Sequence, residues 1–304
     1  MFASATIPQS AVRKAGGGGA APIKISIREL LRLLRPRQWV KNTFVLAPLV
    51  FAREYGSLSS IKLALVAFVM FCLASSACYI VNDLHDRERD RAHPVKRLKR
   101  PLAAGTVSVR TAIVMLVVLY ALLLAGFFRL PALVLPIGGY IALNLAYTYY
   151  LKDQPVIDIF SIATGFVMRV WAGAMALDVP LSSWMAITTL CLALYLASIK
   201  RRQELENAGT DTRRVLAHYS VALVDRYAEM SAVGALIFYS LFVMSNSNTL
   251  VATIPLVIFG LFRYWYVVES KEEGESPTDV VLTDGPLIAC IIAWLGVCVI
   301  SLKP

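Results

Sequence analysis

The sequence predicts an all-α integral membrane protein, and three observations support this class. Hydrophobic residues make up 58% of the 304 residues and charged residues only 16%, whereas soluble domains carry roughly 25% charged residues. The apolar residues form windows long enough to cross about 30 Å of hydrocarbon as helices. Basic residues gather in alternate connecting segments, as is typical of multi-pass membrane proteins.

The first predicted elements are a tail and a surface helix. Residues 1–22 contain four consecutive glycines and many small residues, so we expect a disordered N-terminal tail. Residues 23–38 place apolar and basic side chains on opposite faces of a helix that runs up to Pro36. This pattern predicts an interfacial amphipathic helix. We expect residues 23–304 to form a single transmembrane domain.

Nine apolar windows follow, and each one predicts a transmembrane helix. They lie at about 40–55, 61–82, 111–128, 132–150, 156–176, 183–199, 229–246, 249–268 and 285–302. With the N-terminus in the cytoplasm, all but five of the 30 Lys and Arg residues fall in cytoplasmic segments. The formal net charge of +10 then faces anionic lipid head groups and phosphorylated substrates. Because this charge is spread over membrane loops, we expect no nucleic-acid partner.

A run of acids stands where the second predicted span meets a basic loop. Asp83, Asp86 and Asp90 are spaced i, i+3 and i+7, so on one helix their carboxylates share a face. Asn82 adds an amide oxygen. Such hard oxygen donors suit Mg²⁺, which completes its shell with waters and substrate phosphates. The alternative is a solvated helix end whose acids pair with neighbouring arginines.

Cations surround and follow the acids. Arg87 lies within the acidic run, and Lys96, Arg97, Lys99 and Arg100 come after it. A leaving diphosphate needs both a metal and cations, because both neutralise its developing charge. We therefore expect Arg87, Lys96 and Arg100 to bind donor phosphates, although ordinary loop charge explains part of this pattern.

These residues carry a resemblance to a known family. Asn82-Asp83-x-x-Asp86-x-x-x-Asp90 followed by Arg100-Pro101-x-x-x-Gly105 resembles the first aspartate-rich motif of the UbiA-type membrane prenyltransferase superfamily. The resemblance covers nearly the whole chain from Arg35 onward. It implies a helical bundle around a central cavity that opens to the cytoplasmic face and to lipid. It also implies Mg²⁺ as cofactor, held by Asn82, Asp83, Asp86 and Asp90, with Asp83 and Asp86 required for catalysis.

The second cytoplasmic loop departs from most of that superfamily. Members that prenylate aromatic rings carry a second aspartate-rich motif there, whereas this chain has Lys200, Arg201 and Arg202 before Glu204. Three cations favour phosphate oxygens over a second metal ion. We therefore expect these four residues to bind the donor and Lys200 to take part in catalysis.

Three further segments narrow the resemblance to one branch. The second loop, Arg35-Pro36-Arg37-Gln38-Trp39-Val40-Lys41-Asn42, His93-Pro94-x-Lys96 and Asp284-Gly285-Pro286 are together similar to the decaprenyl-phosphate phosphoribosyltransferase branch. This implies transfer of the 5-phosphoribosyl group from phosphoribosyl pyrophosphate to a decaprenyl-like polyprenyl phosphate in a bacterial inner (plasma) membrane. An aromatic prenyltransferase that uses a polyprenyl diphosphate is the alternative. A carrier would need repeated half-helices, which the sequence does not show.

The acceptor lipid phosphate also needs cations near the membrane surface. Arg37, Lys41, Lys152 and Arg169 are the candidates. Arg169 lies inside a predicted span, where an arginine costs roughly 3 kcal/mol or more unless it faces a partner or a wet cavity. Asp158 falls on nearly the same helix face and is a further candidate. In the structural alternatives, Arg169 pairs with carbonyls of another helix, and Lys152 extends its ammonium group to the lipid head groups.

Two remaining expectations concern a tyrosine and the chemistry. Tyr149 belongs to a tyrosine cluster at the cytoplasmic end of the fourth span. An aromatic belt explains it, and a hydroxyl that reaches ribose or phosphate is the alternative. The acceptor phosphate has a second pKa of about 6 and is already a nucleophile at neutral pH, so no general base is required. The sequence leaves open whether the chain forms a homo-oligomer.

Overall fold

The computed structural model of the chain describes residues 26–94, 96–208, 214–270 and 277–303, and within these ranges all regular elements are helices. The predicted all-α class is therefore confirmed. In chain order the elements are α1 (Ile27–Leu34), η1 (Pro36–Leu46), α2 (Ala47–Phe51), η2 (Glu54–Gly56), α3 (Leu58–His85), α4 (Arg87–Ala92), α5 (Lys96–Lys99), α6 (Pro101–Ala104), α7 (Val109–Arg129), η3 (Pro131–Leu133), α8 (Val134–Tyr149), η4 (Leu151–Asp153), α9 (Ile157–Leu177), α10 (Ser183–Ala208), η6 (Arg214–His218), α11 (Val221–Asn246), η7 (Asn248–Thr253), α12 (Ile254–Ser270), α13 (Pro277–Thr283) and α14 (Gly285–Ser301).

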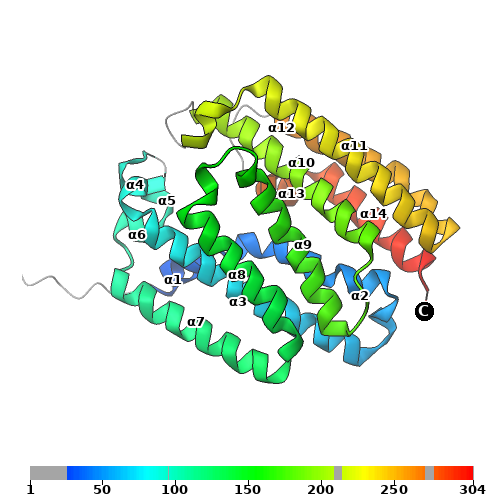
Figure 1. Cartoon of the computed structure of the whole chain (residues 1–304), viewed down its shortest axis with the longest axis horizontal. Helices are drawn as coiled ribbons and strands as arrows, with labels where there is room; N and C mark the ends of the chain where they lie inside the picture. Colours follow the sequence, from blue (N-terminus) through cyan, green and yellow to red (C-terminus); the bar gives the residue numbers. More distant parts are fainter. Residues whose placement is uncertain (1–25, 95, 209–213, 271–276, 304) are drawn as a thin grey trace, which may run out of the picture.

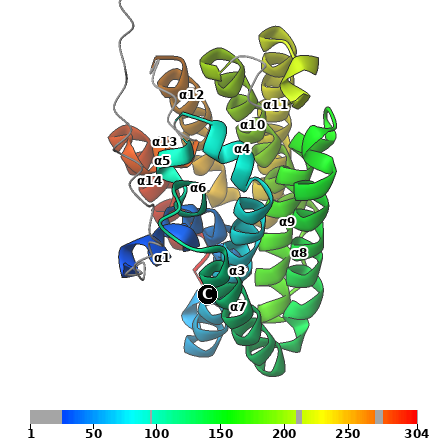
Figure 2. The ribbon, with the colours of Figure 1, turned by 90° about the vertical axis from the view of Figure 1, so that its left-hand side faces the viewer.

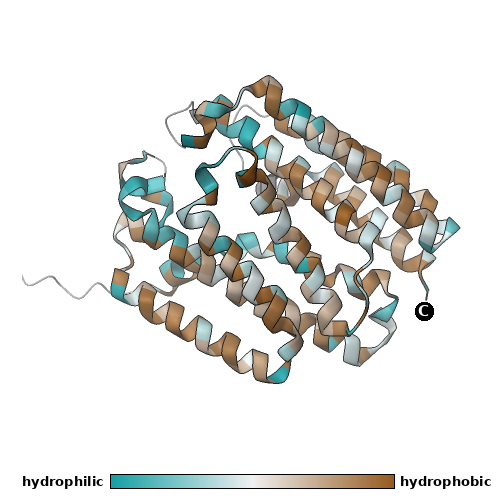
Figure 3. Ribbon diagram, viewed as in Figure 1, coloured by the Kyte–Doolittle hydropathy of each residue, from teal (hydrophilic) through white to brown (hydrophobic). Residues whose placement is uncertain are grey.

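The long helices form a bundle, and the short helices α4, α5 and α6 gather at one end of it (Figures 1 and 2). Hydrophobic residues run along the long helices, while hydrophilic residues concentrate at the end that carries α4 and α5 (Figure 3). We call this end the polar end. Because α3, α8 and α10 all finish there, residues far apart in the sequence meet near their last turns.

Seven helices in the described residues are long and apolar enough to cross a membrane. They are Leu58–His85, Val109–Arg129, Pro131–Tyr149, Ile157–Leu177, Ser183–Glu206, Val221–Asn246 and Asn248–Ser270. They coincide with seven of the nine predicted windows, and the chain is a multi-pass membrane protein. The ninth window forms the shorter α14, with 17 residues.

The first predicted window, residues 40–55, does not form one α-helix. It consists of the 11-residue 3₁₀ helix η1, the five-residue α2 and a turn at Arg53, where φ is 62°. Pro36 begins η1 and Pro48 lies in the first turn of α2. Both prolines lack a backbone donor, and together they favour short segments over a continuous α-helix. The described residues therefore do not confirm nine regular transmembrane helices.

Close packing holds η1 against α3 and α9. A Cβ atom on Gly173 of α9 would collide with the carbonyl oxygen of Val45, so glycine permits the two backbones to touch. On the α3 side, Asn42 Nδ2 donates to Ser75 Oγ at 3.0 Å. The segment that carries Arg37 is thus fixed to two of the long helices.

Helix α1 ends before Pro36, as predicted. Arg35 ends it in the left-handed conformation, with φ at 54°. Leu33 is fully buried and packs with Ile80 and Leu102, so α1 belongs to the fold rather than to the tail. The predicted tail, residues 1–22, lies outside the described residues.

Candidate active site

The acidic run spans a bend between two helices. Helix α3 ends at His85, and α4 begins at Arg87. The backbone hydrogen bonds continue across the bend, because the amide of Asp86 donates to Asn82 O and that of Asp90 to Asp86 O, both at 2.9 Å. The acids therefore keep the shared helical face that their spacing predicts.

Four residues of the run line one small polar pocket. The pocket measures about 40 Å³ and is lined by Asn82, Asp86, Arg89, Asp90, Lys96, Arg100, Tyr147, Lys152 and Asp153. Since a water occupies roughly 10–15 Å³ on this measure, the pocket has room for a hydrated ion. Of the predicted donor cations, it contains Lys96 and Arg100, and of the predicted acceptor cations it contains Lys152.

The carboxylates of the run face cations rather than each other. Asp83 Oδ1 accepts hydrogen bonds from Arg35 Nη2 at 2.5 Å and Arg100 Nη1 at 2.9 Å. Arg100 also pairs with Asp90, and Lys152 Nζ lies 2.7 Å from Asp86 Oδ1. Within the described residues no three His, Cys, Asp or Glu side chains converge in a metal-binding arrangement. The run is therefore held in an ion-pair network.

One oxygen of this network lacks a partner within the described residues. Asp83 Oδ2 is buried and accepts no hydrogen bond there, although a buried carboxylate oxygen without a partner is costly. Asp90 is also buried, and this burial raises its pKa, while the nearby Arg100 lowers it. A cation placed beside Asp83 Oδ2 would remove the deficit, so the donor set fits a hard metal ion.

Arg87 lies outside this pocket. It is half-buried, and its Nε is 3.7 Å from Glu88 Oε1. Its contacts are those of the alternative stated above, a solvated helix end with paired charges. The prediction that it binds donor phosphate has no support in these contacts.

Residues 200–206, predicted as a loop, instead form the last turns of α10, which runs to Ala208. We keep the name second loop for them, and their cations contact acids within the protein. Arg201 is fully buried, and it donates to Asp158 Oδ2 and Glu204 Oε2, each at 2.6 Å. Arg202 lies within 3.2 Å of three carboxylates, on Glu206, Asp225 and Glu269. Lys200 is the most exposed of the three predicted cations, with 38% of its side chain exposed. Its Nζ is 3.9 Å from Glu204. Lys200 is therefore the cation of this loop with the best access to a ligand.

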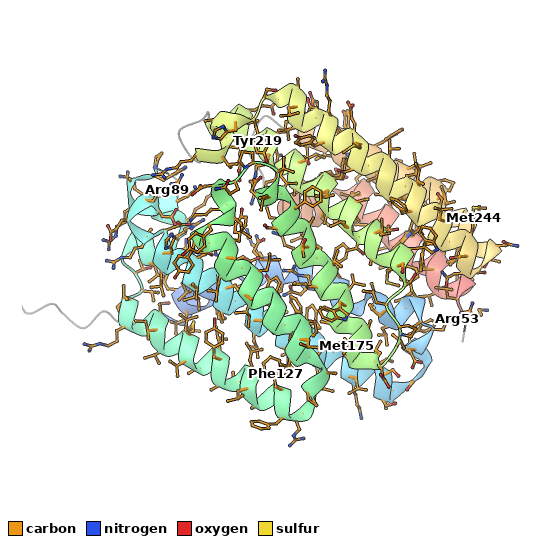
Figure 4. The ribbon with its side chains drawn as sticks, viewed as in Figure 1. Arg53, Arg89, Phe127, Met175, Tyr219 and Met244 are labelled. Atoms are coloured by element: carbon orange, nitrogen blue, oxygen red, sulfur yellow. The ribbon has the colours of Figure 1, made fainter. Side chains whose placement is uncertain are left out.

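A buried network connects the second loop to the polar pocket. Asp158, predicted as a possible ligand residue, instead accepts from Arg201 and from Tyr219 Oη at 2.7 Å. Arg201 Nη2 also donates to Tyr147 Oη at 3.3 Å, and Tyr147 lines the pocket. Tyr219 and Arg89 both lie at the polar end, opposite Arg53 and Met244 (Figure 4).

Sequence reasoning missed two residues of this site, Arg35 and Tyr147. Arg35 was considered only as part of a branch motif, although it is 5.1 Å from the Tyr79 ring and bonds Asp83. Tyr147 stood in the tyrosine cluster from which only Tyr149 was selected. Tyr149 itself is half-exposed and contacts His85 at 4.8 Å between ring centroids. Their positions along the helix separate the two, because residues two apart lie on different faces of α8.

Arg169 lies in a buried cage away from the pocket lining. Its guanidinium donates to Asn42 Oδ1 at 2.8 Å, to the carbonyl of Gly165 at 2.7 Å and to Tyr140 Oη at 3.1 Å. The rings of Phe71, Tyr140 and Phe166 surround it at 4.8–5.1 Å. The contacts are structural but differ from the predicted pairing with carbonyls of another helix, because the one backbone carbonyl among them, that of Gly165, belongs to Arg169's own helix. They give no support to binding of a lipid phosphate. Arg37 is exposed and Lys41 half-buried on η1.

Comparison with known proteins decides the family. The model of the UbiA prenyltransferase family matches residues 43–279. The chain belongs to the UbiA prenyltransferase family. Its membership confirms the resemblance that the first acidic motif carries.

Curated relatives of this UbiA chain cover most of its length. A decaprenyl-phosphate phosphoribosyltransferase of Mycolicibacterium smegmatis is 36% identical over 299 residues, which are 91% of this chain and 93% of that one. The protein of the same name from Corynebacterium glutamicum is 36% identical over 283 residues, 88% of this chain and 84% of that one. Among solved structures, a UbiA homolog from Archaeoglobus fulgidus bound to GPP and Mg²⁺ has a TM-score of 0.69 at 20% identity, covering 91% of this chain and all of that one. It shares the fold.

Proposed function

We propose that this chain transfers the 5-phosphoribosyl group from phosphoribosyl pyrophosphate to a polyprenyl phosphate, with release of pyrophosphate and dependence on Mg²⁺. Its relatives of 36% identity carry the name of this activity. The observation in this chain that carries the proposal is the pocket where Asp86 and Asp90 stand beside Lys96, Arg100 and Lys152. Oxygen donors and cations in one place suit a pyrophosphate leaving group.

A magnesium ion fits the bend between α3 and α4. Asn82, Asp83, Asp86 and Asp90 would hold it, because they offer hard oxygens and one buried oxygen without a partner in the described chain. When bound, the ion neutralises charge on the departing pyrophosphate. The Mg²⁺ named for the Archaeoglobus fulgidus homolog supports this assignment.

The chemistry requires positioning and charge neutralisation more than proton transfer. A phosphate oxygen of the lipid forms the bond to the anomeric carbon of ribose, and the bond from that carbon to pyrophosphate breaks. The electron pair leaves with pyrophosphate, whose negative charge Lys96 and Arg100 neutralise. Because the acceptor phosphate already ionises near neutral pH, the reaction needs no general base. We assign the sugar's own phosphate to Lys200, the most exposed of the three cations in the second loop.

The second loop favours this reaction over aromatic prenylation. A second metal site would require free carboxylates there, but Asp158 and Glu204 are both bonded to Arg201. Arg202 adds three further ion pairs with acids. Asp83 keeps one oxygen without a partner in the described residues, whereas both oxygens of Asp158 are bonded, to Arg201 and to Tyr219. Asp158 therefore offers a poor site for a divalent ion.

We also propose a membrane placement with nine crossings and a cytoplasmic polar end. The 3₁₀ rise of 2.0 Å gives η1 a length of roughly 22 Å, and α2 adds roughly 7 Å. This sum approaches the thickness of about 30 Å that a bilayer core requires, so η1 and α2 serve as the first crossing and α14 as the last. The polar end faces the cytoplasm of a bacterial plasma membrane. Labelling of Glu88→Cys from the cytoplasmic side and of Arg53→Cys from the outside tests this placement.

The activity is tested with the purified full chain in phospholipid vesicles. Phosphoribosyl pyrophosphate labelled in the ribose is incubated with polyprenyl phosphate and Mg²⁺. We expect label to enter the lipid fraction with an equal amount of pyrophosphate released. A parallel reaction offers a polyprenyl diphosphate and an aromatic acid. Prenylation of the aromatic acid without transfer of the ribose label would overturn the proposal in favour of the alternative.

A further inference from the structure

Helix α1 presents an apolar face with no protein cover in the described chain. Ile27 is 76% exposed and Leu31 is 49% exposed, one helical turn apart. Leu98 on the neighbouring α5 is 68% exposed. Arg32 Nη2 joins the two helices, because it donates to the carbonyl oxygens of Leu98 at 3.3 Å and Lys99 at 3.4 Å. We call Ile27, Leu31 and Leu98 the apolar surface of α1 and α5.

Cations accompany this surface. Arg28 on α1 and Arg97 and Lys99 on α5 are all exposed. The single acid of α1, Glu29, is paired with Arg32 at 2.9 Å, so it does not offset these charges. Exposed apolar side chains accompanied by Lys and Arg are what an anionic phospholipid surface binds, with apolar insertion and charge attraction acting together.

The other side of α1 holds the active-site loop. Besides the contacts of Arg32, Glu29 Oε2 accepts from Thr106 Oγ1 at 2.9 Å. At the end of the helix, Arg35 reaches Asp83 Oδ1 at 2.5 Å. One eight-residue helix therefore touches the end of α3, the end of α5 and the turn after α6. Such a short helix is marginal alone, so contacts on its faces decide whether it stays formed.

We infer that α1 and α5 dock on the anionic phospholipid surface of the membrane and that this docking holds residues 96–106 and Asp83 in place. Lipid binds the apolar surface, and α1 transmits the restraint through Arg32 and Arg35. The consequence for activity rests on the proposed function, whereas docking and loop restraint do not. The partner is the lipid surface itself rather than a second protein.

Docking is tested with a depth-sensitive fluorophore on the full chain. Ile27→Cys is labelled in a Cys191→Ala, Cys290→Ala background, because these two native cysteines are only half-buried. The matched control is Glu88→Cys, whose native side chain is 76% exposed on α4. In vesicles containing brominated lipid, we expect quenching at position 27, stronger with phosphatidylglycerol than with phosphatidylcholine alone, and none at position 88. Equal signals at both positions, or no response to the anionic lipid, overturn the docking.

Restraint of the loop is tested by amide hydrogen exchange of residues 96–106. We expect Arg32→Gln, and separately the Ile27→Asn, Leu31→Asn double variant, to speed exchange about tenfold, as for loss of one hydrogen bond to a charged group. The exposed Arg110 at the start of α7 supplies the control Arg110→Gln, which should not change it. Unchanged exchange in both α1 variants overturns the restraint.

The two proposals fail separately. If the chain makes no phosphoribosyl lipid, fluorescence quenching and hydrogen exchange still decide the docking and the restraint. If the activity is present, both α1 variants should raise the KM for phosphoribosyl pyrophosphate in anionic vesicles while the folded fraction stays unchanged. A normal KM in both variants would show that α1 does not serve the site.

Discussion

Nζ of Lys152 lies 2.7 Å from Oδ1 of Asp86, so a cation from the segment after α8 neutralises an acid at the end of α3. Both groups line the polar pocket, and Lys152 is largely buried. The two residues were predicted for different tasks, one for lipid phosphate and one for metal. With the proposed roles, the metal and the lipid phosphate would be bound within one hydrogen bond of each other, as transfer between two phosphorylated substrates requires.

The first prediction concerns the acids at the bend. Asp83→Asn and Asp86→Asn keep shape and polarity but remove charge, and we expect turnover to fall by about 100-fold or more, as when a group that stabilises the transition state is lost. Phosphoribosyl transfer is measured over a range of Mg²⁺ concentrations. Chelation of divalent ions should abolish the activity of the wild type, and added Mg²⁺ should restore this activity.

Glu88→Gln is the matched control for these variants. Glu88 lies in the same run but is exposed, and it pairs with Arg91 at 3.1 Å. Its activity should equal that of the wild type. Full wild-type activity in the presence of EDTA would falsify the metal assignment.

The second prediction separates Lys200 from Arg201. Lys200→Ala should raise the KM for phosphoribosyl pyrophosphate and leave thermal stability nearly unchanged, because the side chain is partly exposed. Arg201→Ala leaves Asp158 buried with one partner fewer, so we expect a loss of about 3–5 kcal/mol in the free energy of unfolding. Thermal unfolding and donor titration are measured on both. If the Arg201→Ala variant is stable but has a high KM for the donor, Arg201 binds phosphate as the sequence predicts.

The sequence predicted the helices more fully than the contacts of the cations. Hydropathy located the seven long helices because each must match the bilayer, and the acidic run kept the face that its spacing implied. Charge alone could not tell Arg201, which is buried against Asp158, from Lys200, which is partly exposed. The distinction depends on which side chain points into the bundle, and that is decided by packing of α10 against α9.

The break in the first window was equally hard to foresee. Windows that count apolar residues do not register the contact between Val45 and Gly173, which are far apart in the sequence. Arg35 was missed for a similar reason, because its partner Asp83 lies 48 residues further along the chain. Pairings of this kind follow from the way α1, η1 and α3 pack together.

The third prediction tests that packing. Gly173→Ala forces η1 away from α9, and we expect a loss of about 1–3 kcal/mol or more in the free energy of unfolding, as for an overfilled core. The control is Gly296→Ala on α14, where a Cβ meets nothing within 4 Å. There we expect a gain of roughly 0.5–1 kcal/mol, because alanine favours the helix over glycine. Equal unfolding temperatures for the two variants would contradict the close approach.

The fourth prediction decides the role of Arg169. Its guanidinium has protein partners on all three nitrogens, so Arg169→Gln should lower the unfolding temperature and leave the KM for polyprenyl phosphate unchanged. Arg169→Lys should recover stability only in part, because an ammonium cannot reproduce the planar fork. The exposed Arg37 offers the contrast: Arg37→Gln should raise the KM for the lipid and spare stability. If Arg169→Gln instead weakens use of the lipid at normal stability, the buried cage opens to the acceptor, and Arg169 binds its phosphate as the sequence first indicated.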